Sequence, residues 1–337
     1  MPIVYRVFFC IVFRLSYYGM LIEEHFMNNP ACSHGRPQEG SAVLLTIFLS
    51  AIIITIGVGF NWIVKEHLKA AAALKDKSEA MVAATSAYES FIYATLTGKM
   101  LNDRLVLSDE TLLGTAQLPI NNAAVKIGNN VTISIQDSNG KVSVAYGMSN
   151  ELTRLMYHID NTKNISELTD SINDWTDGDD IARPNGAEID YYRAQARDYT
   201  PANSELQYTE ELLLIRGMDV DFFRKLRPCI TILPSTGFNP NSASAEVLYA
   251  YLNLTPDAIK AITDYTSSAS VDSLDDFNKL SGTGLTPSLD RDYLTPSMYL
   301  DVTVQCSLNS ALYTISTGIG LNAGDFSPYQ VFYWREG

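Results

Sequence analysis

A run of 24 residues without a charged side chain places the strongest constraint on this chain. It extends from residue 41 to residue 64 and reads SAVLLTIFLSAIIITIGVGFNWIV. At about 1.5 Å per residue, a helix of this length crosses a hydrocarbon layer of roughly 30 Å. The sequence therefore predicts a membrane anchor near the start of the chain.

The junction in front of the anchor predicts where the mature chain begins. Residues 34–40 read HGRPQEG, a polar stretch that ends in Gly40. A secretory signal peptide is cut after its apolar segment, whereas the cut expected here lies before it, between Gly40 and Ser41. Residues 1–40 are therefore predicted to be a leader. Met27 is the expected translation start, because the apolar stretch upstream is interrupted by Arg6.

Charge excludes one class of partner. Removing 40 residues from 337 leaves 297, and these carry the whole formal charge of −14 because the charges of the leader cancel. Such a chain repels nucleic-acid phosphates. The cations that follow the anchor would by the positive-inside rule place the C-terminal part in the cytoplasm. They are Lys65, Lys69, Lys75 and Lys77.

The cysteines of the mature chain allow at most one disulfide bond. The leader holds two of the four, so the mature chain keeps Cys229 and Cys306. This number permits a disulfide but no disulfide framework. A disulfide and a pair of buried free thiols both remain open.

Beyond the anchor, the pattern predicts one α+β domain with an insertion. Residues 65–97 are Ala-rich, lack Gly and Pro, and repeat apolar side chains at helical spacing, and Gly98 is a natural end for this helix. Alternating residues at 131–135 and 141–144 flank an Asn-Gly pair, which predicts a hairpin. Strand signals return at 299–306, 312–317 and 330–334.

The segment between these strands contains an internal repeat. Residues 172–176 (INDWT) recur as 262–266 (ITDYT), and residues 210–217 (EELLLIRG) recur as 275–282 (DDFNKLSG). Each copy is predicted to pair a helix ending in an aromatic residue with a short helix that ends at Gly. We expect the two copies to pack as one helical domain over 150–292. The first copy alone carries a long loop, 177–204.

This loop concentrates carboxylates. Within 17 positions it and the preceding turn supply Asp174, Asp177, Asp179, Asp180, Glu188 and Asp190, with Arg183 as the one cation among them. A hard divalent cation relieves such repulsion by binding six to eight oxygens, and Gly178 and Gly186 permit tight turns. Composition leaves a calcium site and a solvated acidic loop equally open.

A catalytic interpretation of the loop is disfavoured. Two carboxylates such as Asp177 and Glu188 could act as acid and base in glycoside hydrolysis. The mature chain has two histidines. His67 lies in the predicted helix 65–97 and His158 lies beside a predicted helix start, and both are far from any cleft motif. The sequence thus favours a protein that is not an enzyme and has no small-molecule substrate.

Residues 238–248 (FNPNSASAEVL) predict a turn and a helix capped by Ser242 or Ser244. The pattern is typical of a helix-hairpin-helix unit, a fold often used on DNA. DNA binding needs a Gly-rich hairpin and cations, whereas the hairpin here, 253–257, reads NLTPD in an acidic domain. We expect the fold without a nucleic-acid function.

Over most of its length the chain resembles the K-class minor pseudopilins of type II secretion. The matching stretches are 172–179 (INDWTDGD), 183–188 (RPNGAE) with Tyr191 and Tyr192, 211–217 (ELLLIRG) and 239–248 (NPNSASAEVL). The leader resembles those of type IV prepilins, which a peptidase removes after glycine on the cytoplasmic side. Such subunits usually carry Glu at the fifth mature position; Leu45 stands there, a departure that points to the K class.

The resemblance implies an α+β fold with a pilin-like long N-terminal helix packed on an antiparallel sheet. A large duplicated all-helical insertion, of two SAM-like or helix-hairpin-helix-like units, interrupts the sheet. The expected divisions are the leader 1–40, the transmembrane and stem helix 41–97, the first pilin-like part 98–149, the insertion 150–292 and the closing strands 293–337.

The resemblance also implies a function. It is that of a non-catalytic subunit at the tip of the periplasmic pseudopilus, which initiates or caps the fibre for export of folded proteins across the outer membrane. The implied partners are the I and J minor pseudopilins, the prepilin peptidase and the inner-membrane secretion platform. The chain would cross the inner membrane once, with its C-terminal domain in the periplasm.

A structural Ca²⁺ is implied as well, with ligand candidates by position at Asp177, Asp179, Asp180 and Glu188. Two alternatives remain for the function. A minor pilin of a type IV pilus would share the stem but normally lacks the insertion. A membrane-anchored periplasmic hydrolase would use the acidic loop.

Overall fold

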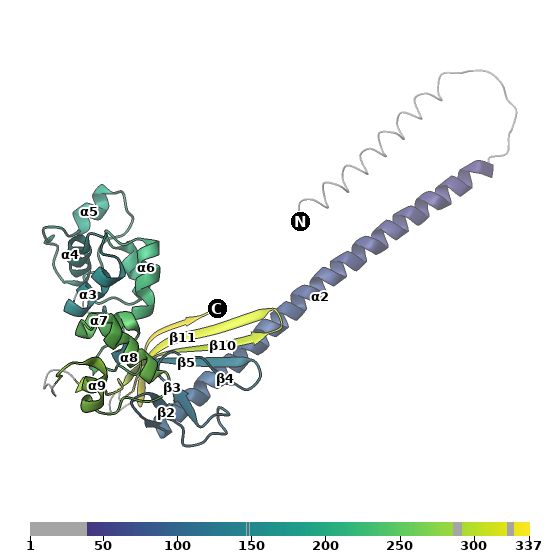
Figure 1. The fold of residues 1–337 in the computed structure, drawn as a ribbon. Helices are drawn as coiled ribbons and strands as arrows, with labels where there is room; N and C mark the ends of the chain where they lie inside the picture. The colour runs from purple at the N-terminus through teal and green to yellow at the C-terminus, as the bar shows by residue number, and fades with distance from the viewer. Residues whose placement is uncertain (1–38, 146, 148, 286–291, 322–326) are drawn as a thin grey trace. The chain divides into compact units, whose positions relative to one another are not determined.

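The computed structural model describes residues 39–145, 147, 149–285, 292–321 and 327–337 (Figure 1). The predicted leader and the Met27 start fall mainly on residues 1–38, which lie outside the described residues. The chain divides into two compact units, Met1–Leu68 and Lys69–Gly337.

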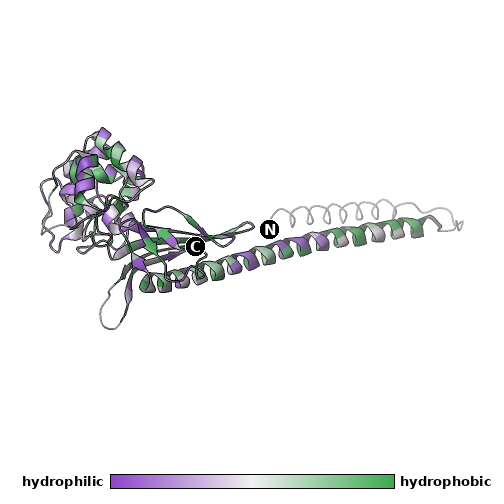
Figure 2. Cartoon of the chain, turned by 60° about the horizontal axis from the view of Figure 1, so that its bottom comes forward, coloured by the Kyte–Doolittle hydropathy of each residue, from purple (hydrophilic) through white to green (hydrophobic). Residues whose placement is uncertain are grey.

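The described part of the first unit is one apolar helical segment. Helix α2 (Glu39–Thr97) begins there and continues into the second unit. Among the described residues it is the one helix long and apolar enough to cross a membrane, with a mean hydropathy of 2.6 over its 18-residue window. Figure 2 shows the apolar residues gathered along this stretch. These features fit a single-pass membrane anchor.

In the second unit, α2 has one face of small and aromatic residues that packs on a sheet. Ala80, Ala84 and Phe91 are fully buried in the core that α2 shares with the sheet. The helix ends at Thr97. A Cβ at Gly98 would lie 2.6 Å from the carbonyl oxygen of Val106, so the close approach of the next strand requires glycine there. The predicted end of the helix is confirmed.

The sheet that covers α2 is antiparallel and is built from both ends of this unit. Within the described residues its order is β12-β11-β10-β5-β4. Its strands are β4 (Val125–Ile127), β5 (Val131–Asp137), β10 (Tyr299–Leu308), β11 (Ala311–Leu321) and β12 (Tyr329–Glu336). Strand β5 pairs with β10, with Leu300 opposite Asp137. The predicted insertion between two parts of one sheet, and the three closing strands, are confirmed.

Smaller ladders connect the sheet to the rest of the unit. Strands β1 (Lys99–Met100), β2 (Arg104–Val106) and β3 (Gln117–Pro119) form an antiparallel sheet after α2. Two parallel pairs follow, β6 (Val142–Ser143) with β7 (Ile230–Thr231) and β8 (Gly237–Phe238) with β9 (Asp292–Tyr293).

The predicted hairpin around the Asn-Gly pair is wrong. Residues 138–140 form a 3₁₀ helix, and β6 pairs with β7 instead of returning along β5. The Asn139 side-chain oxygen accepts hydrogen bonds from the Thr236 and Gly237 amides, at 3.1 and 3.0 Å. A Cβ at Gly140 would lie 2.4 Å from the carbonyl oxygen of Ser242. Tertiary contacts with the insertion thus decide the path here.

The insertion contributes helices around a second core. They are α3 (Asn150–Ile159), α4 (Ile165–Thr176), α5 (Ile189–Ala194), α6 (Val220–Leu226), α7 (Ala245–Leu252), α8 (Pro256–Thr266) and α9 (Leu274–Ser281). Buried residues from both proposed repeat copies, such as Trp175 and Ile262, belong to this core. Cys229 lies in it, whereas Cys306 lies in the sheet core, and both are free thiols. The disulfide alternative is therefore wrong.

The two repeat copies share their first piece and differ in the second. Helices α4 and α8 end at the matching residues Thr176 and Thr266. In the second copy α9 is followed by Gly282, which adopts the left-handed conformation and caps the helix. In the first copy, where a helix of the same kind was expected, residues Thr209–Leu214 form a 3₁₀ helix. The division into two SAM-like units stays a prediction.

The helix-hairpin-helix geometry expected after residue 238 is formed by α7 and α8. The Ser244 side chain accepts from the Val247 amide and caps α7, which decides between the two expected serines. Asn253 turns the chain in the left-handed region, and Thr255 caps α8. Ser242 has another role, at the junction with the sheet.

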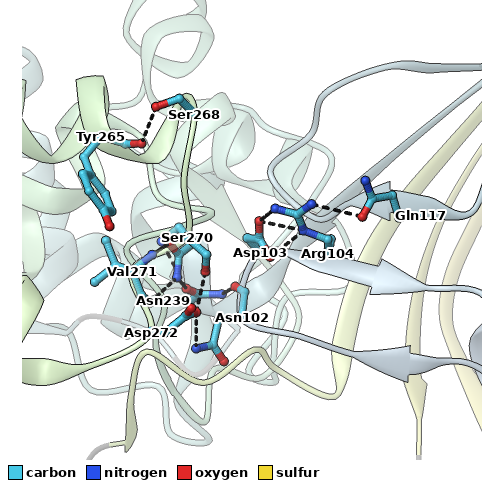
Figure 3. A network of polar contacts seen from close by, with 11 residues as sticks. Asn102, Asp103, Arg104, Gln117, Asn239, Tyr265, Ser268, Ser270, Val271 and Asp272 are labelled. Atoms are coloured by element: carbon cyan, nitrogen blue, oxygen red, sulfur yellow. Dashed lines mark hydrogen bonds and ion pairs between the residues drawn. The ribbon is translucent and has the colours of Figure 1, made fainter.

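A buried polar junction joins the insertion to the sheets (Figure 3). The Asn239 amide nitrogen donates to the Asn102 carbonyl at 2.7 Å and to Asp137 Oδ2 at 2.8 Å. The Asn239 oxygen accepts from both the backbone and the side chain of Asn241, which in turn exchanges two hydrogen bonds with the Val271 backbone. Asn239 thereby links the β1–β2 turn, the end of β5 and the loop before α9.

Replacing Asn239 with Ala should therefore destabilise the protein. It removes one of the donors to the buried Asp137 carboxylate and also the side-chain partner of the Asn102 carbonyl and of the Asn241 amides, which together costs about 3 kcal/mol. Urea unfolding of the full chain in detergent measures the effect. Asn129→Ala, at an exposed asparagine in the β4–β5 turn, is the control and should change the free energy of unfolding by less than about 0.5 kcal/mol. Equal stabilities of the two variants would contradict the role of the junction.

Candidate metal centre after helix α4

Helix α4 presents three carboxylates on one face. Asn164 caps its start by accepting from the Glu167 amide at 3.2 Å. Asp170, Asp174 and Asp177 follow at spacings of four and three, which places them on the same side of the helix end. Asp174 is fully buried. The chain then leaves α4 and returns over this face through residues 183–188.

The returning loop brings three predicted ligands together. One oxygen from each of Asp177, Asp179 and Glu188 lies within 4.8 Å of the other two. Asp180 is outside this group, and its Oδ1 accepts from the Asn203 side-chain amide at 3.0 Å. The structure thus gathers three of the four predicted metal ligands and turns the fourth toward Asn203.

Glu188 is the most unusual member of the group. Its side chain is only 3% exposed, and among the described residues neither carboxylate oxygen has a hydrogen-bond partner. Asp177 Oδ1 and Asn203 Oδ1, near the two ends of the loop 177–204, are also buried without a hydrogen-bond partner in the described part of the chain. Buried oxygens without donors are rare because they lose solvation without compensation. A set of this kind is what a hard, oxygen-binding cation requires.

The pKa of Glu188 is raised to about 7, first by burial and then by the nearby carboxylates, led by Asp174 and Asp177. The ionised form therefore lacks stabilisation in the metal-free protein. A bound cation would reverse this balance by favouring the carboxylate.

Arg183 is the counter-charge within the loop. Its guanidinium donates to Asp174 Oδ1 at 2.7 Å and also to Asp177 Oδ2. Its backbone amide donates to both Asp174 oxygens, at 3.3 and 3.2 Å. These two carboxylates hold the pKa of the guanidinium above its usual range. One oxygen of Asp177 thus accepts from Arg183, and the other has no hydrogen-bond partner among the residues that the structure describes.

Further contacts fix the returning loop. Arg216 donates to the Gly186 carbonyl and to Glu167, each at 3.0 Å, and stacks over Tyr191. Asn185 donates through its backbone and side chain to Asp170, at 3.0 and 2.9 Å. The loop is therefore held on α4 by two arginines and an asparagine.

Sequence reasoning missed several of these residues. Asp170 could have been found, because it stands four positions before Asp174 on the expected helix. Arg216 lies in a matched stretch, but its contact with the loop depends on the tertiary fold. Asn203 gave no local signal. The predicted cleavage pair lies at the start of α2, where the described backbone is helical.

Comparisons with known proteins agree with the family resemblance seen in the sequence. Residues 121–235 match the family model described as type II secretion system (T2SS), protein K. Type II secretion system protein K of Pseudomonas aeruginosa is 32% identical over 117 residues, 34% of this chain and 35% of that protein. The proteins of the same name from Pectobacterium carotovorum and Klebsiella pneumoniae are 34% and 39% identical over 80 and 67 residues, 24% and 20% of this chain.

The matched stretches thus span only about a fifth to a third of the length of these relatives. A solved structure is similar over a longer stretch. It is a chain of the GspK-GspI-GspJ complex of the enterotoxigenic Escherichia coli type 2 secretion system. The alignment has a TM-score of 0.52 and 17% identity, and covers 81% of this chain and 99% of that chain, which establishes the fold.

The architecture is a long N-terminal helix, apolar enough to cross a membrane, that packs on an antiparallel sheet, with a large helical insertion that carries the acidic loop. Residues 121–235 are similar to the type II secretion system protein K family, and the fold is similar to that of a chain of the GspK-GspI-GspJ complex.

The two glycines of the loop should respond differently to substitution. A Cβ at Gly186 would lie 1.9 Å from Asp174 Oδ2, whereas a Cβ at Gly178 meets nothing within 4 Å. Gly186→Ala is therefore expected to lower the free energy of unfolding by roughly 2 kcal/mol or more, because it displaces a buried carboxylate. Gly178→Ala, the matched control, should leave stability unchanged within about 0.5 kcal/mol or raise it slightly. Urea unfolding followed by tryptophan fluorescence tests both, and similar losses would contradict the described loop.

Proposed function

We propose that this chain is a minor pseudopilin at the tip of the periplasmic pseudopilus, where it initiates or caps the fibre that exports folded proteins across the outer membrane. The helical insertion between β5 and β10 carries the proposal. It enlarges the head of a subunit whose other parts are a stem helix and a pilin-like sheet. A subunit of this size blocks the addition of another above it, and only the tip tolerates that.

Leu45 supports the same position. In pilin-like fibres, an acid at the fifth mature position is thought to pair with the terminal amine of the neighbouring subunit. Leu45 is an exposed apolar residue of α2 and offers no such charge. A tip subunit has no neighbour above it with which to pair.

The proposed partners are the I and J minor pseudopilins, together with the prepilin peptidase and the inner-membrane secretion platform. Support for the I and J partners comes from the similar solved chain, which belongs to the GspK-GspI-GspJ complex. We propose that α2 anchors the chain in the inner membrane with the C-terminal domain in the periplasm. The lysines after the anchor oppose this orientation, and removal of a leader on the cytoplasmic side favours it.

A non-catalytic role is part of the proposal. As an acid or base, Glu188 would have to reach a glycosidic oxygen, but its side chain is only 3% exposed. This burial disfavours the hydrolase alternative. The insertion disfavours a type IV minor pilin, which shares the stem but normally lacks such a domain.

Processing by a prepilin peptidase tests the proposal. Co-expression of the full chain with the peptidase should shift its mobility on a denaturing gel, because the leader is removed after Gly40. Gly40→Glu should abolish the shift, and Gly35→Glu, in the predicted leader, should retain it. An unshifted wild-type chain would contradict the assignment to a pseudopilin.

We further propose that the acidic loop holds a structural Ca²⁺. Asp177, Asp179 and Glu188 would supply the central oxygens, with Asp180 as an additional candidate. The support is the three-carboxylate group and the unpartnered oxygens of Glu188 and Asp177 within the described part of the chain. When bound, the cation would link the end of α4 to the start of α5.

Stability as a function of pH and calcium tests this site. In the metal-free protein the pKa of Glu188 is about 7, against a usual value of 4.5, so its contribution to stability is full below pH 4.5 and is lost as the pH rises through 7. In EGTA at pH 8, Glu188→Gln should therefore exceed the wild type by roughly 2 to 3 kcal/mol, and near pH 4 the two should be equal.

Calcium should reverse this order. It is expected to raise the melting temperature of the wild type at pH 8 and to have a much smaller effect on Glu188→Gln, because binding stabilises the folded state in proportion to affinity. Glu205→Gln removes the same charge from an exposed position and should behave as the wild type. A wild type without a calcium-dependent shift would reject the metal site.

A further inference from the structure

We propose that Arg183 is a built-in counter-ion of the acidic loop, and that a divalent cation binds there by displacing the Arg183 guanidinium from Asp177. This inference rests on the calcium site proposed above. It makes Arg183 a positioning residue that sets the affinity of the site, rather than a ligand.

The first observation is the division of the Asp177 carboxylate. Its Oδ2 accepts from the Arg183 guanidinium. Its Oδ1 is buried without a partner among the described residues and belongs to a side chain that shares the three-carboxylate group with Asp179 and Glu188. The Asp177 carboxylate can thus bind two positively charged groups, one at each oxygen. The Arg183 guanidinium occupies one of these two positions.

The second observation is the unequal burial of the partners. Asp174 is fully buried and Asp177 is 28% exposed, whereas the Arg183 side chain is 37% exposed. The guanidinium can therefore move toward water while the carboxylates stay in place. Asp174 would keep a donor after this movement, because the backbone amide of Arg183 also donates to it.

Electrostatics makes the two cations competitors. A divalent ion on Asp177 and a guanidinium on the same carboxylate would lie within several ångströms of each other, where repulsion between unscreened charges is strong. Linkage makes the effect reciprocal: the guanidinium weakens metal binding by the same factor by which the metal weakens the ion pair. Without metal, Arg183 stabilises the otherwise repulsive carboxylates.

The arrangement therefore predicts opposite effects of removing Arg183. The metal-free protein loses a partner for a fully buried carboxylate and becomes less stable. The site becomes more negative and binds calcium more tightly. A purely structural salt bridge would give the first effect without the second.

Calorimetric titration of the full chain in detergent with CaCl₂, after stripping with EGTA, measures the affinity, and thermal unfolding in EGTA measures the metal-free stability. Arg183→Met is expected to lower the calcium Kd about tenfold and to lower the melting temperature in EGTA. The calcium-induced rise in melting temperature should exceed that of the wild type. Arg224→Met is the matched control; Arg224 is 73% exposed on α6, where it pairs with Asp221, and its loss should change neither quantity.

Arg183→Lys provides a second test if Arg183→Met does not fold in EGTA. Lysine keeps the charge but is a point charge that cannot hold two carboxylates through a fork of donors, so its Kd should lie between those of the wild type and Arg183→Met. If only this variant folds, a Kd below that of the wild type supports the proposal and an equal or higher Kd overturns it.

The outcomes separate this inference from the calcium proposal. If the wild type binds calcium and Arg183→Met binds it equally or more weakly, the counter-ion role is overturned and the calcium site stands. If Arg183→Met binds calcium and the wild type does not, the counter-ion role is supported and the calcium site of the natural chain is rejected. If neither binds, both proposals are overturned.

Discussion

The arrangement of the second unit depends on the hydrogen bonds that the buried carboxylate of Asp137 accepts. It stands at the end of β5, and its side chain is fully buried. In the described part of the chain it accepts hydrogen bonds from the amides of Asn139 and Ser297 and from the side chains of Asn239 and Ser242. Burial raises the pKa of Asp137, and these hydrogen bonds oppose the rise. The donors come from the turn after β5, from the insertion and from the segment that leads into β10. One carboxylate thus fixes where the chain leaves the sheet and where it returns.

The acidic loop also contains a fully buried carboxylate, but there a charged side chain is among its hydrogen-bond donors. Asp174 is as deeply buried as Asp137, but its donors include the charged Arg183 guanidinium beside the Arg183 backbone amide, whereas the donors to Asp137 are all neutral. Neutral donors suit a permanent junction because they satisfy the carboxylate without a competing charge. A mobile cation suits a site that another cation can occupy. Glu188 lies beside Asp177 in this loop, and within the described residues both of its buried carboxylate oxygens lack a hydrogen-bond donor.

Much of the fold could be predicted because the decisive signals are local. The Ala-rich helix ending before Gly98 and the closing strands rest on side-chain periodicity, and both are confirmed; the uncharged run forms a helix that fits a membrane anchor. The Asn139-Gly140 pair misled because its local meaning is a hairpin, whereas here Asn139 binds the 236–237 amides and Gly140 packs against Ser242.

The acidic site was predictable only in part, for the same reason. Carboxylate density located the loop, but which oxygens meet depends on how residues 183–188 return over α4. Asp180 lies outside the central group and accepts a hydrogen bond from Asn203, a residue for which the sequence gives no pattern. Three of the four stretches that carry the family resemblance, 172–179, 183–188 and 211–217, lie within the matched region 121–235, and the fourth, 239–248, follows it.

We propose above all that this chain occupies the tip of a pseudopilus together with the I and J minor pseudopilins. Co-expression of the chain with the I and J subunits of its own secretion system, followed by size-exclusion chromatography and native mass spectrometry in detergent, tests it most directly. The account predicts one complex that contains all three subunits. Recovery of an I–J complex with this chain always eluting alone would contradict it.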